Sequence, residues 1–193
     1  MKRLCVFCGS NVGLRPDYAA AARDMAATLA ARDIGLVYGG GRVGLMGILA
    51  DEMLARKGDV VGVIPRMLSE REVGHAGLAQ LHVVETMHDR KAKMAHLADG
   101  FIALPGGIGT LEEIFEVWTW AQLGSHRKPC GFLDVNGFFE PLFEFLDRMV
   151  EERFLAPRFR QIAIVESDPE RLIDRFLEYE APDVARWIDH ERT

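Results

Sequence analysis

Short apolar runs alternate with longer amphipathic stretches along most of this chain. Runs such as Ile34–Tyr38 and Gly100–Leu104 hold almost only apolar residues, which is typical of parallel strands buried on both faces. The stretches between the runs repeat apolar residues at helical spacing, as at Leu111, Ile114 and Trp118. The sequence therefore predicts strands that alternate with helices.

This alternation predicts an α/β fold of one kind, a Rossmann-like doubly wound sheet that is mainly parallel, with helices on both faces. The expected strands, about seven in number, cover residues 4–8, 34–38, 59–64, 81–85, 100–104, 129–133 and 162–165. The expected helices cover residues 17–32, 43–57, 88–98, 111–123, 138–152 and 169–179. With 193 residues, 49% of them hydrophobic, the chain can bury a full core, and we expect one domain over residues 1–193.

The stretch from Pro105 to Glu113, P-G-G-I-G-T-L-E-E, lies where an expected strand passes into an expected helix. At such a turn, glycines let the backbone approach an anion, while free N–H groups and the helix dipole favour negative charge. The stretch thus joins a phosphate-binding turn to a carboxylate, which suggests chemistry on a phosphorylated sugar. A structural role stays open, because Thr110 and Glu113 have the spacing of a capping box and glycine is common at strand-to-helix turns.

A second glycine-rich turn, Gly39 to Gly47, contains G-x-G-x-x-G after the expected strand 34–38. A dinucleotide site also needs an acidic residue at the end of the next strand, but Asp59 opens that strand, so NAD binding is disfavoured. The chain has no G-x-x-x-x-G-K-[ST] loop. With Cys8-Gly9-Ser10-Asn11 after the first strand, three turns fall at carboxyl ends of strands, where open parallel sheets bind ligands.

A basic segment, Met87 to Met94, precedes the strand that leads into Pro105. Its charge pattern is typical of an exposed helix face. However, Arg90 and Lys91 lie near the helix start, where a cation interacts unfavourably with the helix dipole unless an anion is present. A phosphate would supply that anion. Right-handed winding of the two helices around one strand could place Arg90 and Glu113 around a common crevice.

Charge and composition narrow the classes of partner. A net charge of −6 argues against a general nucleic-acid binder. Without an apolar stretch of membrane-spanning length or a signal-like start, we expect no membrane partner and a cytoplasmic protein. Cys5 and Cys8 have C-x-x-C spacing, yet they lie on a strand rather than at a helix start, and no second pair completes a zinc site. A redox or metal site is therefore disfavoured.

Taken together, the motifs resemble the LOG ("Lonely Guy") family, cytokinin riboside 5'-monophosphate phosphoribohydrolases, whose older name is possible lysine decarboxylase. The resemblance rests on P-G-G-x-G-T-x-x-E at Pro105–Glu113, the Met87–Lys91 segment and Trp120–Leu123, and it runs from Cys5 to about Leu155. Residues 156–193 match less clearly. The resemblance implies hydrolysis of the N-glycosidic bond of AMP or N6-prenyl-AMP, and a homodimer or larger homo-oligomer. This reaction requires no cofactor and no metal, so none is expected.

By the same resemblance, Arg90 and Glu113 are the expected catalytic residues. The turns and the resemblance together give the expected substrate contacts: Ser10, Gly40, Gly41, Glu72, Met87, Lys91, Pro105, Gly106, Gly107, Ile108, Gly109, Thr110, Leu111, Glu112 and Thr119. Breaking a C–N glycosidic bond builds positive charge on the ribose, and a fixed carboxylate such as Glu113 stabilises it.

Two other classes of function remain in view. A non-catalytic nucleotide or cofactor carrier on the same fold is opposed by the presence of both Arg90 and Glu113. A DNA-processing relative is opposed by the net acidity. Decarboxylation with pyridoxal phosphate is disfavoured, because the lysines lie in charged or helix-edge contexts rather than in a Schiff-base setting.

Overall fold

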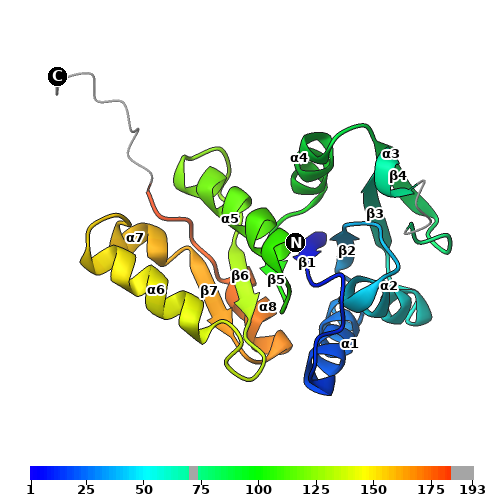
Figure 1. The fold of residues 1–193 in the computed structure, drawn as a ribbon, viewed down its shortest axis with the longest axis horizontal. Helices are drawn as coiled ribbons and strands as arrows, with labels where there is room; N and C mark the ends of the chain where they lie inside the picture. Colours follow the sequence, from blue (N-terminus) through cyan, green and yellow to red (C-terminus); the bar gives the residue numbers. More distant parts are fainter. Residues whose placement is uncertain (70–73, 184–193) are drawn as a thin grey trace.

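The computed structural model describes residues 1–69 and 74–183, which form one twisted sheet with helices on both of its faces (Figure 1). The seven strands are all parallel and lie in the order β4-β3-β2-β1-β5-β6-β7. Their bounds are β1 Arg3–Phe7, β2 Gly35–Tyr38, β3 Val60–Pro65, β4 Gln80–Val84, β5 Phe101–Ala103, β6 Cys130–Leu133 and β7 Ala163–Glu166.

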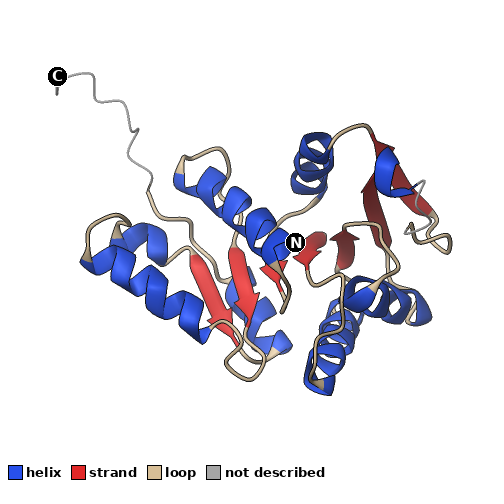
Figure 2. Ribbon diagram, in the orientation of Figure 1, coloured by secondary structure: helices blue, strands red, loops and turns tan. Residues whose placement is uncertain are grey.

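Helices connect the strands as crossovers (Figure 2). The longer helices are α1 Pro16–Ala31, α2 Gly44–Ala55, α4 Met87–Leu97, α5 Ile108–Gln122, α6 Glu140–Glu151 and α8 Pro169–Leu177. Two short helices, α3 Arg66–Ser69 and α7 Pro157–Arg160, have four residues each. No helix of the described residues is long and apolar enough to cross a bilayer.

Two apolar cores cover the two faces of the sheet. Alternate strand residues such as Leu4 and Leu36 pack with α1, α2 and α8 on one face. Their neighbours Cys5 and Val37 point the other way and pack with α4, α5, α6 and α7. Because both faces are buried, the inner strands read as continuous apolar runs instead of alternating ones.

The chain order reverses between β1 and β5, which pair in register from Cys5 opposite Phe101 to Phe7 opposite Ala103. The connections after these two strands leave toward opposite faces, α1 on one and α5 on the other. A crevice therefore opens outside the carboxyl ends of β1 and β5, the usual ligand position in such sheets.

The predicted fold class is confirmed, and each predicted strand and long helix is present with ends shifted by at most a few residues. The short helices α3 and α7 were not predicted, because four residues are too few to show helical periodicity. Helix α5 was expected from residue 111 but begins at Ile108, so Gly109 lies inside the helix.

Candidate active site at the carboxyl edge of the sheet

The turns that follow β1 and β5 and the start of α2 are joined by backbone hydrogen bonds. The N–H of Gly9 donates to the Pro105 carbonyl at 3.1 Å, and the Leu45 N–H donates to the Gly9 carbonyl at 3.0 Å. A Cβ on Gly44 would stand 2.2 Å from the Ser10 carbonyl carbon, so only glycine permits this approach. The three turns therefore form one rigid edge of the crevice.

Arg90 reaches this edge from helix α4. The helix start is fixed by a capping box in which Thr86 and Asp89 bond each other's backbone N–H groups. The buried guanidinium donates from Nη1 to Glu113 Oε1 at 2.6 Å and from Nε to the Val63 carbonyl at 3.2 Å. The two side chains that the sequence suggested around one crevice thus meet directly.

Glu113 lies in the second turn of α5 and is also buried. Burial raises the pKa of its carboxyl above the ordinary value, and the charge and hydrogen bond of Arg90 oppose that rise. A carboxyl group held between these opposing effects, beside a cavity, is typical of a catalytic acid or base.

A cavity of about 290 Å³ lies beside this pair. Its wall includes Ser10, Met46, Met87 and the first turn of α5 from Gly107 to Thr110. A Cβ on Gly107 or Gly109 would meet no atom within 4 Å, so these two glycines face open space. An anion can therefore approach the N–H groups at the start of α5 without obstruction.

The capping-box interpretation of Thr110 and Glu113 was wrong. Gly107 is the N-cap, no side chain caps the start of α5, and Thr110 is a buried residue within the first turn. No acidic side chain occupies this first turn, so the positive end of the helix dipole meets no carboxylate there. The Glu113 carboxylate is paired with Arg90 instead.

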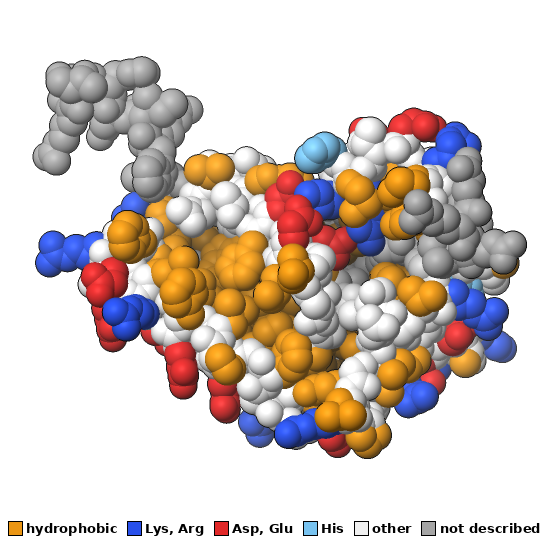
Figure 3. Space-filling view, viewed as in Figure 1, with side chains coloured by type: hydrophobic (Ala, Val, Ile, Leu, Met, Phe, Trp, Pro, Cys, Tyr) orange, Lys and Arg blue, Asp and Glu red, His pale blue; other side chains and the backbone are white. Residues whose placement is uncertain are grey.

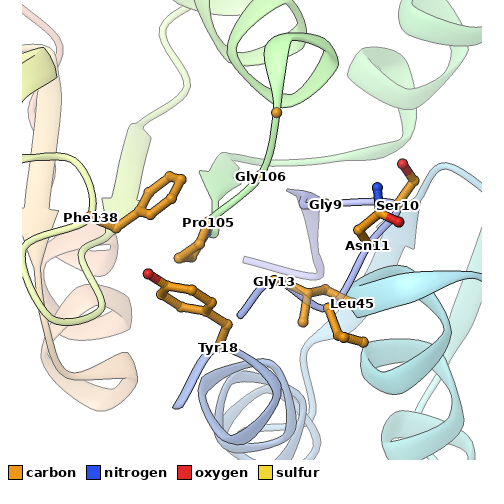
Figure 4. A pocket seen from close by; sticks show the side chains of 11 residues that line it. Gly9, Ser10, Asn11, Gly13, Tyr18, Leu45, Pro105, Gly106 and Phe138 are labelled. Carbon is orange, nitrogen blue, oxygen red and sulfur yellow. The ribbon is translucent and has the colours of Figure 1, made fainter. Parts of the chain in front are cut away.

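A smaller cavity of about 180 Å³ adjoins the first at the crevice, and Ser10 and Gly107 line both. Its walls are apolar: the rings of Tyr18 and Phe138 pack edge to face at 5.6 Å on one side, with Leu45 across from them (Figure 4). None of its lining residues is charged. Tyr18 and Phe138 were not predicted, because a lone aromatic residue near a turn gives no sequence signal that separates it from core packing.

Lys91 is buried and turned toward α5, where it forms ion pairs with Glu112 and, at 3.0 Å, with Glu116. Arg90 and Lys91, adjacent in α4, therefore both bond to glutamates of α5. This ladder fixes the spacing of the two helices that supply the charged side chains of the cavity.

Several expected contacts lie elsewhere. Gly40 and Gly41 are outside both cavities, in the turn below Arg90. Thr119 is exposed, donates its hydroxyl to the Phe115 carbonyl at 2.7 Å, and lines a separate apolar groove of about 420 Å³. Glu72 lies outside the described residues.

The apolar groove runs between α5 and α6, and Figure 3 shows it as a hollowed hydrophobic patch over these helices. Phe145 and Phe154 expose 57% and 87% of their surface there.

Cys5 and Cys8 have the C-x-x-C spacing of redox and metal sites, but both are free and buried, and burial raises the pKa of both thiols.

Comparison with known proteins gives related sequences over most of the chain. The model of a family described as "Possible lysine decarboxylase" matches residues 46–176. Cytokinin riboside 5'-monophosphate phosphoribohydrolase LOG7 of Arabidopsis thaliana is 48% identical over 179 residues, 93% of this chain and 82% of the relative. The enzyme LOG of Oryza sativa subsp. japonica is 47% identical over 178 residues, 92% of this chain and 74% of the relative.

Solved structures with the same fold are more distant in sequence. The molybdenum cofactor binding protein of Rippkaea orientalis superposes with a TM-score of 0.70 at 18% identity, covering 92% of this chain and 97% of its own. The molybdenum cofactor carrier protein MCP of Chlamydomonas reinhardtii gives a TM-score of 0.66 at 17% identity, covering 92% and 99%. At this identity the likeness concerns the fold alone.

Proposed function

Since the chain belongs to the LOG family of cytokinin riboside 5'-monophosphate phosphoribohydrolases, we propose that it hydrolyses the N-glycosidic bond of AMP or N6-prenyl-AMP in the cavity beside Arg90 and Glu113. The products are the free base and ribose 5-phosphate. The observation that carries the proposal is the buried pair of Arg90 and Glu113, 2.6 Å apart, at the wall of a cavity that opens on the first turn of α5.

The 5'-phosphate binds at the start of α5 in this proposal. The N–H groups of the first turn and the helix dipole supply positive potential, and the open space at Gly107 and Gly109 lets phosphate oxygens approach. Anchoring the phosphate there fixes the ribose over Glu113, which lowers the entropic cost of reaching the transition state.

The chemical step uses the two charges differently. As the bond between C1' and the base nitrogen breaks, its electron pair leaves with the base and positive charge grows on the ribose, where the Glu113 carboxylate stabilises it. A water oxygen bonds to C1', Glu113 takes a proton from that water, and the proton ends on the departing nitrogen. Arg90 holds the nucleotide and offsets negative charge on the leaving base.

The assembly we propose is a homodimer or higher homo-oligomer. The groove between α5 and α6 offers an apolar surface to a second copy, since Phe145 and Phe154 are exposed along it. Thr119 lies in the same groove, so the contact that we propose between Thr119 and substrate requires the assembled form and is not made in the cavity of its own subunit.

We place the enzyme in the cytoplasm, where buried free thiols such as Cys8 and Cys130 stay reduced.

The alternative function is a carrier that binds a nucleotide or cofactor without turnover. The molybdenum cofactor proteins named above share the sheet and its helices, so the fold is compatible with binding without turnover. The paired Arg90 and Glu113 favour hydrolysis, since a carrier does not need a carboxylate buried against a guanidinium beside the bound ligand.

One assay separates the two functions. Purified protein is incubated with AMP and with isopentenyladenosine monophosphate, and base release is followed for wild type, Glu113→Ala and Arg90→Ala. We expect release by wild type and a loss of about a hundredfold or more in each variant. Lys93→Ala, a cation removed from the same helix but away from the cavity wall, is the matched control. Binding of AMP without base release would support the carrier, and unchanged rates in folded variants would refute the two roles.

A further inference from the structure

His75 is a buried histidine that belongs to neither cavity. Its side chain is 2% exposed, and both ring nitrogens have partners. The Gly77 N–H donates to Nδ1 at 3.1 Å, so Nε2 carries the proton of the neutral ring and donates to Asp51 Oδ1 at 3.0 Å. A fully bonded ring of this kind fixes the conformation of the segment that carries it.

The segment around His75 is tied to the turn between β2 and α2. The His75 N–H donates to the Gly40 carbonyl at 2.9 Å, and Gly41 forms an antiparallel bridge with Gly74. Asp51, whose carboxylate accepts the hydrogen bond from the ring, lies in α2, the helix that follows this turn, and Arg42 Nη2 lies 3.5 Å from the same carboxylate oxygen. The hydrogen bond from the His75 ring to Asp51 therefore adds a side-chain contact to the backbone bridge that joins this segment to the turn.

The guanidinium of Arg90 packs against the backbone of this turn. A Cβ on Gly39 would stand 2.1 Å from Arg90 Nη2, so the guanidinium rests directly on the Gly39 backbone. Gly40 adopts φ +74° and fits against Ile64 and Leu81, where a Cβ would come to 3.1 Å from each side chain. The position of the turn therefore limits where the guanidinium of Arg90 can lie relative to Glu113.

From these contacts we infer that His75 is a positioning residue for the hydrolysis: through Asp51 and Gly40 it holds the Gly39–Gly41 turn in place, and the turn holds Arg90 against Glu113. The inference rests on the proposed function, because it assigns His75 a role in the reaction that Arg90 serves. If the bonds of His75 contributed only to folding, the effect of a His75 substitution on kcat/KM would be the same with and without the Arg90 side chain. If His75 positions Arg90, that effect should disappear once Arg90 is replaced.

The test is a double-mutant cycle between His75 and Arg90. Wild type, His75→Ala, Arg90→Lys and the double variant are compared by kcat and KM for AMP, with unfolding by urea to measure stability. Because small displacements of a catalytic group are costly, we expect His75→Ala to lower kcat/KM about tenfold when Arg90 is present. In the Arg90→Lys background the same change should alter kcat/KM by less than about twofold.

Two further variants sharpen the result. His75→Gln places an amide N–H near the position of Nε2, can donate to Asp51, and should restore most of the activity lost in His75→Ala. His82→Ala, which removes a half-buried histidine from the neighbouring strand β4, is the control and should leave kcat/KM unchanged. Losses from His75→Ala and Arg90→Lys that simply multiply, or a Gln variant as slow as the Ala variant at equal stability, would overturn the inference.

Failure of the inference and failure of the proposed function give different outcomes. If wild type releases no base, the proposed hydrolysis is wrong, and the same four proteins, wild type and three variants, are then compared by calorimetric Kd for AMP. Coupling between His75 and Arg90 in that binding constant would still support positioning, and additivity would refute it.

Discussion

Gly39 lies directly beneath the guanidinium of Arg90, so close that a Cβ at this position would stand 2.1 Å from Nη2. The clash would involve the far end of a long side chain, so a substitution here moves Arg90 before it disturbs the sheet. We therefore expect Gly39→Ala to fold with a melting temperature near that of wild type and to lose activity about a hundredfold, as for a catalytic group displaced by about 1 Å.

Steady-state kinetics and thermal unfolding of Gly39→Ala test this expectation together. Gly74→Ala is the matched control, because a Cβ on Gly74 would make only ordinary contacts, the nearest at 3.7 Å, and its φ is not positive. Full activity in Gly39→Ala would show that Arg90 does not need its present position.

Two glycines near the start of α5, Gly106 before the helix and Gly109 inside it, should respond in opposite ways to substitution by alanine. Gly109 lies inside the helix with open space beside it, so Gly109→Ala should stabilise the protein by about 0.5–1 kcal/mol while raising KM, because the new methyl group would meet the phosphate in the proposed binding mode. A Cβ on Gly106 would stand 2.1 Å from Thr110 Oγ1 and 2.9 Å from the Gly9 nitrogen, so Gly106→Ala should destabilise the fold. Chemical denaturation and KM for AMP measure both effects. An unchanged KM in Gly109→Ala would place the phosphate elsewhere.

The raised pKa of Glu113 predicts how activity depends on pH. The proposed reaction requires the carboxylate form of Glu113, and burial raises its pKa above the ordinary 4.5 against the opposing effect of Arg90. The acid limb of the kcat/KM profile should therefore fall at a higher pH than it would for an exposed glutamate. A limb at or below pH 4.5 would contradict the assignment of Glu113 as the group that titrates.

The same shift has a consequence for stability, with a definite sign. Because the folded state holds this proton more tightly than the unfolded state, the contribution of Glu113 to the free energy of unfolding is greatest below pH 4.5 and is lost as pH rises through the raised pKa. Glu113→Gln removes the titration, so the difference in unfolding free energy between wild type and this variant should change across that window. Urea unfolding at several pH values measures it, and a constant difference would refute the shift.

The groove between α5 and α6 predicts how the chain associates. Phe145 lines it with 57% of its surface exposed, so Phe145→Asp should convert an assembled form to monomer by placing a charge in an apolar contact. Leu14→Asp removes an apolar residue that is 97% exposed outside the groove and should leave the assembly unchanged. Analytical ultracentrifugation distinguishes the two. A wild type that sediments as a monomer would refute the proposed dimer.

Much of the fold could be predicted because its signals are local. Buried parallel strands such as β2 and β5 read as apolar runs that end at Gly39 and Pro105, and the intervening helices show their periodicity over three or more turns. The start of α5 could not be placed from the sequence, because Gly109 within G-I-G-T is typical of a turn. Only the contact of the preceding loop with Gly9 shows how the chain enters the helix.

The candidate site was predictable where charge and glycine fall into motifs, and not where it depends on tertiary contact. The helices on either side of one strand suggested that Arg90 and Glu113 share a crevice, and the family resemblance supplied their expected roles. The hydrogen bond between Arg90 and the Val63 carbonyl has no sequence signal. The ring of Tyr18 meets Phe138 across about 120 positions of chain, and His75 meets Asp51 across 24. Such pairs become visible only when the sheet brings its loops together.

Helix α5 carries Glu113 in its second turn and the groove residues Trp118 and Thr119 further along. If a second copy covers that groove, one part of α5 packs in the subunit contact while another part carries the proposed catalytic carboxylate. Catalytic rate per subunit then becomes a function of protein concentration: dilution below the dissociation constant should make each chain a slower enzyme, even with substrate in excess.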